Sequence, residues 1–490
     1  MFTKAILNIV LTCLFVLIRI PAQESIHSID KHRNKNYSIQ VPQQSQFLMK
    51  SNSRLNKSVF GFLPYWELAS ANIRLDLLSH IAIFDFLLTE DGSLLDPPGW
   101  PDDWEPVITS AQSSGVKVLM TISNLPVGGV DPDIVTNLIN NESAQQLFFN
   151  DIKNTIDTYN LDGVILDFEA LNIEDRGEPI TNFTRELRDS LDVWFESKEL
   201  SFATPAVNWG SYWNLAQLAE TCDYLFIMGY DYHGSWSENA GPVAPLTGNE
   251  IYNLVNYGTT IEVDYAGIDP SKLILGVPYY GAQWQTDNSD PYSKVTPKGD
   301  SDSNWVGHID YRNIGWISRP PPNFDPISNT SYFLSTRDRN TYELIWIDSD
   351  YSLSLKYDFA IKKNLAGIGM WSLGKDGNYP ELWNLIEEKF ADSTTSVNDE
   401  NLTGEFVLHQ NYPNPFNPTT SIEYQVASIE KISIRVYDVL GRENKILINE
   451  VKSPGNYSVE FDASNLSSGV YFYVLEAGEV RLSKKMLLLR

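Results

Sequence analysis

Short apolar runs alternate with longer stretches of helical spacing through most of the chain. The runs predict strands at 59–63, 80–86, 117–122, 163–169, 201–205, 224–230, 273–278 and 367–371. Between them lie segments such as "AQQLFFNDIKNTIDTYN" and "TNFTRELRDSLDVWFESK", whose apolar residues recur every three or four positions. Strands that alternate with helices in this way predict an α/β fold over 58–390, namely a (β/α)8 TIM barrel.

Two further regions depart from this alternation. The interval before the last predicted strand is too long for one loop, so a small α+β insertion is expected at about 284–365. After a polar linker at 391–404, apolar and polar residues alternate with period two over 405–490, with turn signals between the runs. This pattern predicts an all-β immunoglobulin-like sandwich.

The first 57 residues carry no core pattern. Lys4, a short apolar stretch and then Pro21-Ala22 predict a signal peptide over 1–22. A membrane anchor is the alternative, but the apolar stretch is shorter than the roughly 20 residues of a spanning helix. Residues 23–57 are polar and without a sustained period, which predicts a flexible leader. Cleavage would leave Cys222 alone, so no disulfide framework is expected.

The charge balance restricts the partners. The 490 residues include 63 acidic and 36 basic ones, which gives a formal net charge of -27. Such a chain repels nucleic acid and anionic membrane surfaces. A neutral polymer is the better substrate, and no nucleic-acid partner is expected.

The stretch "LDGVILDFEALN" at 161–172 carries two acids within an apolar strand. Because strand side chains alternate, Ile165, Asp167 and Glu169 share one face, while the other face is apolar. The acids then face inward at the C-terminal end of a barrel strand, where such barrels hold their catalytic groups. On this pattern alone, an ordinary polar strand end remains the alternative.

Other strand ends add sugar-binding side chains. "YLFIMGYDYHGSW" brings Met228, Tyr230 and Asp231 to one strand end, and "GIGMWSLG" ends its strand at Trp371. Taken singly, Met228, Tyr230 and Trp371 are residues of ordinary core packing. An acid, a phenol donor and a flat apolar platform together describe a site for a sugar.

These motifs resemble the family 18 glycoside hydrolases, the chitinase family, over about 58–390. The resemblance rests on "DGVILDFE", "MGYD", "LILGVPYYGAQW" and the last strand that ends in Trp. It implies a retaining mechanism in which the substrate's own acetamido oxygen is the nucleophile. By motif, Glu169 would be the general acid, Asp167 would orient the acetamido group, and Tyr230 would donate to its oxygen. The predicted substrate-binding residues are Met228, Asp231, Trp371, Tyr280 and Trp66. No metal and no cofactor is expected.

Two positions depart from the family pattern. Ile165 stands where the first Asp of the usual D-x-D-x-E would be, so Asp167 is expected to lack a partner below it. The third-strand sequence "VLMTISNLPVGG" also differs from the usual Ser-x-Gly-Gly.

The C-terminal region has its own resemblance. "QNYPNPFNPTTSIEYQV" and "VYDVLGRE" resemble the C-terminal sorting domains of the type IX secretion pathway. A carbohydrate-binding sandwich is the alternative, but the absence of Trp from this module favours sorting. The resemblance implies contact with the secretion machinery and an extracellular or outer-surface location.

The leading function is therefore a secreted, monomeric hydrolase of β-1,4-linked N-acetylglucosamine polymers, chitin or chito-oligosaccharides. The nearer alternative keeps the mechanism and changes the substrate, as in endo-β-N-acetylglucosaminidases or peptidoglycan hydrolases. The alternative from another class is a catalytically inert glycan-binding protein.

Overall fold

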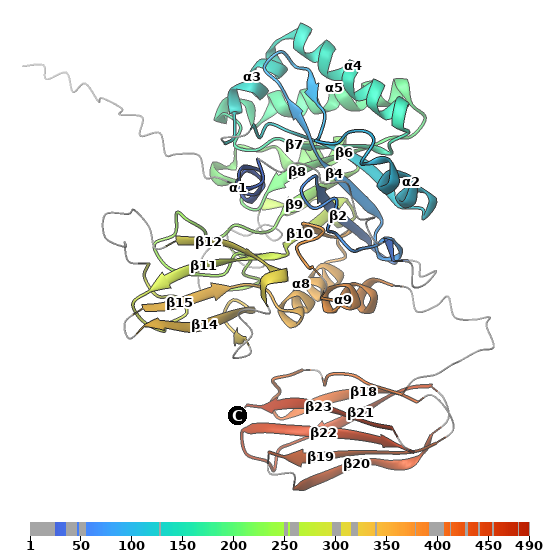
Figure 1. Ribbon diagram of the computed structural model, residues 1–490, viewed down its shortest axis with the longest axis vertical. Coiled ribbons are helices and arrows are strands. Elements are labelled where there is room, and N and C mark those ends of the chain that lie inside the picture. The colour runs from blue at the N-terminus through green and yellow to red at the C-terminus, as the bar shows by residue number, and fades with distance from the viewer. Residues whose placement is uncertain are drawn as a thin grey trace, which may run out of the picture. The chain divides into compact units, whose positions relative to one another are not determined.

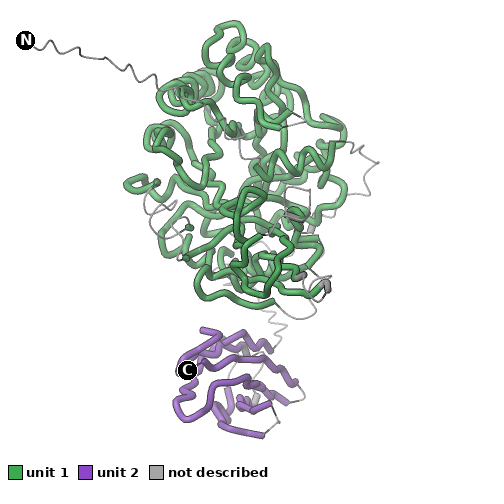
Figure 2. Tube along the Cα trace, turned by 90° about the vertical axis from the view of Figure 1, so that its left-hand side faces the viewer, with its two compact units in different colours: residues 1–393 green, residues 394–490 purple. Residues whose placement is uncertain are grey.

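The computed structural model describes most of the chain in two compact units, Met1–Ser393 and Thr394–Arg490 (Figure 2). The described residues are 25–35, 47–48, 55–126, 129–248, 253–254, 264–295, 305–314, 322–338, 341–377, 379–391, 406–411, 413–426, 430–439, 442–452, 455–478 and 480–489. The predicted signal peptide and nearly all of the predicted linker lie outside them.

The first unit is a closed parallel barrel, as predicted (Figure 1). Its strands follow one another around the barrel in chain order, and the last strand pairs in parallel with the first, which closes it. They are β2 (Ser58–Pro64), β4 (His80–Leu88), β6 (Lys117–Ser123), β7 (Gly163–Asp167), β8 (Glu199–Pro205), β9 (Tyr224–Met228), β10 (Leu273–Pro278) and β16 (Gly367–Trp371). Shorter strands flank them: β1 (Phe47–Leu48) pairs with β3 (Ile73–Arg74), and β5 (Leu94–Leu95) pairs with β4.

The helices of this unit fall between the strands and pack on the outside of the barrel (Figure 1). In α4 (Glu142–Tyr159), the buried residues Ala144, Phe148, Ile152 and Ile156 recur every fourth position and form one apolar face. The helix begins at the capping Asn141 and ends at Asn160 in a left-handed conformation. The other α-helices are α2 (Glu105–Ser113), α3 (Pro132–Asn140), α5 (Glu178–Trp194), α6 (Leu215–Thr221), α8 (Asp350–Lys362) and α9 (Glu381–Phe390). Short 3-10 helices lie at Leu75–Leu77, Ile173–Asp175, Trp209–Ser211, Pro270–Lys272 and Tyr311–Asn313.

An antiparallel sheet forms the predicted insertion. Its strands lie in the order β12-β11-β15-β14-β13, and α8 follows β15 along the chain. The bounds are β11 (Tyr280–Thr286), β12 (Trp305–Asp310), β13 (Asn323–Asp325), β14 (Thr330–Asp338) and β15 (Thr341–Trp346). Since β11 begins two residues after β10 ends, Tyr280 lies where the barrel meets the inserted lobe.

The second unit consists of antiparallel sheets, which confirms the predicted β-structure. One sheet holds β17 (Val407–Leu408), β18 (Thr419–Val426) and β21 (Gly455–Asp462). The other holds β20 (Glu443–Lys452), β19 (Glu430–Asp438), β22 (Gly469–Ala477) and β23 (Val480–Leu488). Alternate residues of both sheets share one apolar core, among them Ile422, Ile434, Phe461 and Leu475.

The N-terminal segment differs from the prediction of a flexible leader. Residues 25–35 contain α1 (Ile26–Arg33), which begins at Ser25, whose hydroxyl accepts a hydrogen bond from the backbone N–H of Ser28. The flexible-leader prediction is wrong for this stretch because α1 is held by charged and polar side chains that face the barrel. Its buried residues are Ile26, His27, Ser28, Asp30 and Lys31, of which only Ile26 is apolar, so no hydrophobic period marks the helix. Among the described residues, no helix has both the length and the apolar character needed to cross a bilayer.

The separate cores predict independent folding of the two units. A chain that lacks residues 394–490 should keep the barrel's thermal unfolding transition and its catalytic activity, because each unit buries its own apolar residues. In the native host, the same deletion should abolish export. Differential scanning calorimetry and fractionation of the culture check the two statements. Loss of the barrel transition in the truncated protein would contradict independent folding.

Candidate active site

The two acids of the "DFE" sequence lie at the C-terminal end of β7. Asp167 is the last residue of the strand and is fully buried, and Glu169 is 6% exposed. The buried Asn124, just after β6, fixes the backbone of Glu169 from both sides. Its Oδ1 accepts from the Glu169 N–H at 2.8 Å, and its Nδ2 donates to the Glu169 carbonyl at 2.9 Å. These two hydrogen bonds fix the backbone position from which the Glu169 side chain extends.

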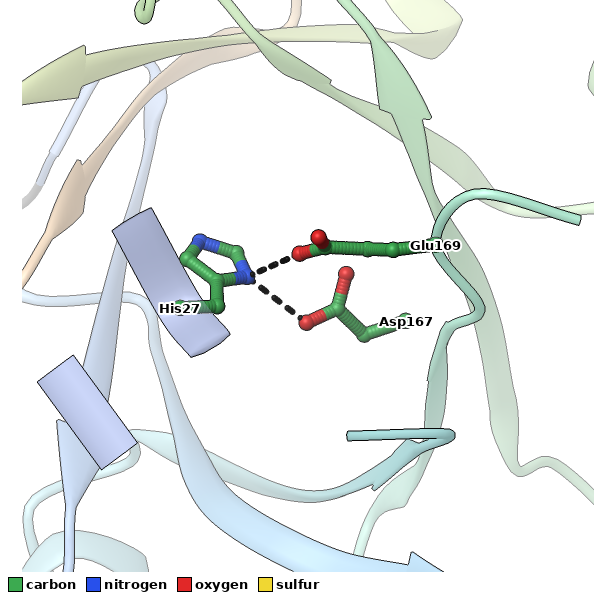
Figure 3. A group of neighbouring side chains, drawn as sticks. All are labelled: His27, Asp167 and Glu169. Atoms are coloured by element: carbon green, nitrogen blue, oxygen red, sulfur yellow. Dashed lines mark hydrogen bonds and ion pairs between the residues drawn. The ribbon is translucent and has the colours of Figure 1, made fainter. Parts of the chain in front are cut away.

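His27 of α1 lies directly against both acids (Figure 3). Its Nδ1 is 2.8 Å from Oδ2 of Asp167 and 2.8 Å from Oε1 of Glu169. One N–H can point at only one of them, and the hydrogen bond goes to Asp167 while Glu169 is an ion-pair contact. The other ring nitrogen, Nε2, is 3.0 Å from the hydroxyl of Tyr230. The imidazole therefore touches all three predicted catalytic residues.

The cluster is strongly coupled electrostatically. Burial alone would lower the pKa of His27, but the carboxylates of Asp167 and Glu169 raise it to about 10, so the ring is a cation at neutral pH. For Glu169, burial raises the pKa, the His27 cation lowers it and Asp167 raises it, and the net direction is upward. Burial and the nearby carboxylates raise the pKa of Tyr230 well above 10, so its hydroxyl keeps its proton.

Aromatic rings surround the imidazole on its other sides. The indole of Trp371, at the end of β16, lies with its centroid 3.7 Å from that of His27 at an interplanar angle of 30°. Phe84 meets the imidazole edge-on at 5.6 Å. The Nε1–H of Trp371 donates to Asp30 of α1 at 3.0 Å. A flat apolar floor with a polar edge is the usual surface for a sugar ring.

Asp231 completes the polar side of the site. Its Oδ1 accepts from the hydroxyl of Tyr280 at 2.6 Å, and its Oδ2 accepts from the backbone N–H of Ile26 at 3.0 Å. The rings of Tyr230 and Tyr280 meet edge to face at 6.0 Å. Residues from β7, β10–β11 and the loop after β9 thus converge on one volume, and α1 fills it.

Comparison with known proteins identifies the first unit. Residues 54–376 match glycosyl hydrolases family 18. The chain belongs to this family. Residues 410–488 match the secretion system C-terminal sorting domain. The second unit is therefore a sorting domain of the type IX pathway, which implies secretion across the outer membrane.

Several relatives of this family 18 chain are known. The Bacillus subtilis protein YdhD is 28% identical over 331 residues, which are 65% of this chain and 73% of that one. The cortical fragment-lytic enzyme of Bacillus subtilis is 23% identical over 64% of this chain and 68% of its own. The fold is shared with a chitinase from Cycas revoluta, with a TM-score of 0.59 and 22% identity over 68% of this chain and 99% of that one.

The candidate site brings together most of the residues singled out from the sequence. Asp167, Glu169, Tyr230, Asp231, Tyr280 and Trp371 all contact α1 or one another. Trp66 is one ring further out, because it packs edge-on against Phe84 at 6.0 Å. Met228 ends β9 and packs against the core.

Sequence reasoning missed Asn124, Asp85, His27 and Lys375. Asp85 is buried in β4, accepts a hydrogen bond from Ser123 and lies 2.7 Å from Nζ of Lys31. An acid inside the apolar run "HIAIFDFLL" is the same signal that marked Asp167, so Asp85 could have been found. The side chain of Asn124 carries no such signal, because its partner is a backbone that only the fold brings near.

His27, Asp167 and Glu169 are also close enough to be considered as ligands of a cation. Nδ1 of His27, however, lies 2.8 Å from each carboxylate oxygen, which is the distance of direct contact. Ligands on one tetrahedral zinc ion, with bonds of about 2.0–2.2 Å, lie roughly 3.3 Å apart. The geometry fits an ion pair.

Ile165 lies in β7 two residues before Asp167. It is fully buried, and its register partners are Thr121 of β6 and Ser201 of β8. Within the described part of the chain, neither Oγ1 of Thr121 nor Oδ1 of Asp167 has a hydrogen-bond partner. An apolar residue at position 165 offers neither atom a hydrogen-bond partner.

The Asn124 contact predicts a loss of both stability and activity on substitution. Asn124→Ala removes the two hydrogen bonds to the Glu169 backbone and a third to the Asp131 carbonyl, and it should lower the free energy of unfolding by about 1–3 kcal/mol. It should also lower kcat more than it raises KM, because it would displace Glu169, the predicted general acid. Urea denaturation and steady-state kinetics measure these effects. Asn182→Ala, at an exposed site that accepts one hydrogen bond from Arg185, should change stability by less than about 0.5 kcal/mol.

Proposed function

We propose that this family 18 protein is an exported glycosidase that cleaves β-1,4-linked N-acetylglucosamine polymers with retention of configuration. The observation that carries the proposal is the convergence of Asp167, Glu169 and Tyr230 on one small polar group. The imidazole of His27 contacts these side chains at 2.8, 2.8 and 3.0 Å. An acetamido group has one N–H donor and one carbonyl acceptor. A carboxylate such as that of Asp167 can accept from the N–H, and a phenol such as that of Tyr230 can donate to the carbonyl oxygen.

In the proposed first step, the substrate's acetamido oxygen attacks C1 of the sugar while Glu169 protonates the departing glycosidic oxygen. Asp167 accepts from the acetamido N–H and stabilises the positive charge that develops there, and Tyr230 donates to the acetamido oxygen. In the second step, Glu169 takes a proton from water, which attacks C1 and restores the acetamido group. Two displacements at C1 retain the β configuration.

The electrostatics support these roles. A general acid must hold its proton near the working pH, and burial together with Asp167 raises the pKa of Glu169. Burial and the nearby carboxylates raise the pKa of Tyr230, so its hydroxyl stays protonated and can donate a hydrogen bond. Trp371, buried and flat, would support the apolar face of the sugar that is cleaved.

Chitin or chito-oligosaccharide is the leading substrate. Peptidoglycan is the nearer alternative, favoured by the similarity to the cortical fragment-lytic enzyme, and an N-glycan core is a further alternative within the same mechanism. An inert glycan-binding role is disfavoured because Glu169 is present with its backbone fixed by Asn124. With the sorting domain, the site of action would be outside the cell or on its outer surface.

The role of Glu169 predicts a selective loss of turnover. Glu169→Gln should lower kcat by roughly 10²-fold to 10⁴-fold with little change in glycan affinity, because it removes a proton donor and keeps the shape. The assay uses chains with and without residues 1–35, since α1 covers the acid in the full chain. Glu174→Gln, at an exposed position, is the matched control and should leave turnover unchanged.

The nucleophile is tested on the substrate itself. Oligosaccharides with a free amine or a hydroxyl at C2 should resist cleavage at that sugar, and the first product should be the β-anomer by NMR. An inverted first product, or full activity without the acetamido group, would refute the substrate-assisted mechanism.

The apolar residue at position 165 leads to a prediction about turnover and its dependence on pH. Ile165→Asp should give Asp167 a proton-sharing partner and shift the acid limb of the pH–rate profile, with turnover equal or higher. A buried carboxylate costs several kcal/mol unless it is paired. Ile165→Asn separates polarity from charge and should leave the acid limb in place. A destabilised Ile165→Asp protein with an unchanged profile would show that the site has adapted to the apolar residue.

A further inference from the structure

Helix α1 fills the volume in which the proposed function requires a sugar. Its His27 ring stacks on Trp371 at 3.7 Å and contacts Asp167, Glu169 and Tyr230, so a sugar ring cannot occupy the same floor. His27 has no exposed surface, and the fully buried state of Trp371 is reached with the helix in place. While α1 is bound, the general acid cannot reach a glycosidic oxygen.

Each buried charged residue of α1 meets an opposite charge on the barrel side. His27 meets the two acids, Asp30 lies 2.8 Å from Nζ of Lys375, and Lys31 lies 2.7 Å from Oδ2 of Asp85. Asp30 and Lys31 are 3% and 6% exposed. Three buried charged residues within two turns of one short helix, each facing an opposite charge, are a built interface, since a buried charge without its partner costs several kcal/mol.

The outer side of α1 is basic and accessible. His32, Arg33 and Lys35 are exposed, and Arg33 and Lys35 follow the last buried residue, Lys31. Arg33 also donates a hydrogen bond to the backbone carbonyl of His308 at 3.4 Å. A protease that cleaves after basic residues can therefore reach the chain at the C-terminal end of the helix. The predicted removal of the signal peptide after Ala22 would leave α1 attached, so that cleavage would not open the site.

We propose that residues 25–35 are an inhibitory pro-segment and that a second proteolytic cleavage, after Arg33 or Lys35, activates the enzyme. The proposal rests on the proposed function, because the volume that α1 fills is the proposed sugar site. Water adds across the peptide bond and gives a new carboxylate and a new amine. Before cleavage α1 binds as part of its own chain, at an effective concentration of the order of mM; afterwards it is a short peptide that can dissociate and be diluted.

The His27 ion pair gives the inhibition a pH dependence of known sign. Three ionisable groups face the ring: Asp167 and Glu169 at the end of β7, and Tyr230 after β9. The pKa of His27 is about 10 when it is bound, against an ordinary value near 6.5. The contribution of the pair is therefore complete below pH 6.5 and is lost as the pH rises toward 10. A peptide of residues 23–35 should bind more weakly at pH 9 than at pH 6.5.

The experiment compares the mature full chain, residues 23–490, with a chain that starts at residue 36. The shorter chain should hydrolyse chito-oligosaccharides at least tenfold faster. The synthetic 23–35 peptide should inhibit it competitively, and limited trypsin treatment of the full chain should raise activity as the N-terminal peptide is released. Equal activity of the two chains, with no inhibition by the peptide, would overturn the proposal.

Point variants of the full chain provide a test that does not depend on deletion. His27→Ala should raise the activity of the full chain several-fold, because it removes the contact with both acids. His32→Ala lies on the exposed side of the same helix and should leave activity unchanged. A peptide carrying His27→Ala should lose inhibition, while one carrying His32→Ala should keep it. Equal effects of the two substitutions would refute specific inhibition by α1 through His27.

Direct binding separates this proposal from the proposed function. Isothermal titration of the 23–35 peptide into the shorter chain needs no turnover, and it should show binding that depends on His27 and is displaced by chitotetraose. If the peptide binds in this way but no glycan is cleaved, α1 covers a glycan-binding site and the proposed catalysis is wrong. If glycan is cleaved and the peptide does not bind, the proposed catalytic function is supported and the inhibitory role of α1 is refuted.

Discussion

The site depends on the burial of two carboxylates two residues apart at the end of one strand. Taking Asp167 and Glu169 out of water is costly, and their mutual repulsion adds to this cost. The protein offsets it locally with the His27 cation, whose other ring nitrogen contacts the Tyr230 hydroxyl. The same cost explains why the site attracts a donor group: whatever enters must bring an N–H or a positive charge to Asp167. A protonated imidazole meets this need as well as an acetamido N–H does.

A network of ion pairs connects the inserted lobe to the candidate site. Lys375, after β16, contacts both Asp310 at the end of β12 and Asp30 of α1, and Arg312 joins Asp310 to Glu67 after β2. Burial alone would lower the pKa of Lys375, but the two carboxylates raise it, so the amine is a cation. If α1 leaves, Lys375 keeps Asp310 and the network between barrel and lobe stays paired. The helix can therefore dissociate without leaving an isolated charge at Lys375.

The two units divide the work of the chain. The described residues of the candidate site all belong to the first unit, and the second unit has a hydrophobic core of its own. If the proposed specificity for N-acetylglucosamine polymers holds, the protein meets such sugars on its way out of the cell, since peptidoglycan contains them. A covered active site would keep the enzyme inactive until it is outside. The proposed inhibition by α1 would thus have a physical purpose that is consistent with the secretion domain.

The sequence by itself determined the barrel, the inserted lobe, the second β-unit and the acids, because each has a local signature. Apolar strands repeat between amphipathic helices, and Asp167 and Glu169 interrupt an apolar strand at its end. Only the tertiary structure decided how Asn124 fixes Glu169, that Trp66 lies one ring outside the site, and that α1 fills it. These depend on contacts between residues far apart in the chain, such as the 140 positions between His27 and Asp167. A helix whose buried residues are mostly charged has no hydrophobic period, so its polar sequence predicts a flexible leader until its opposite charges are seen across the barrel mouth.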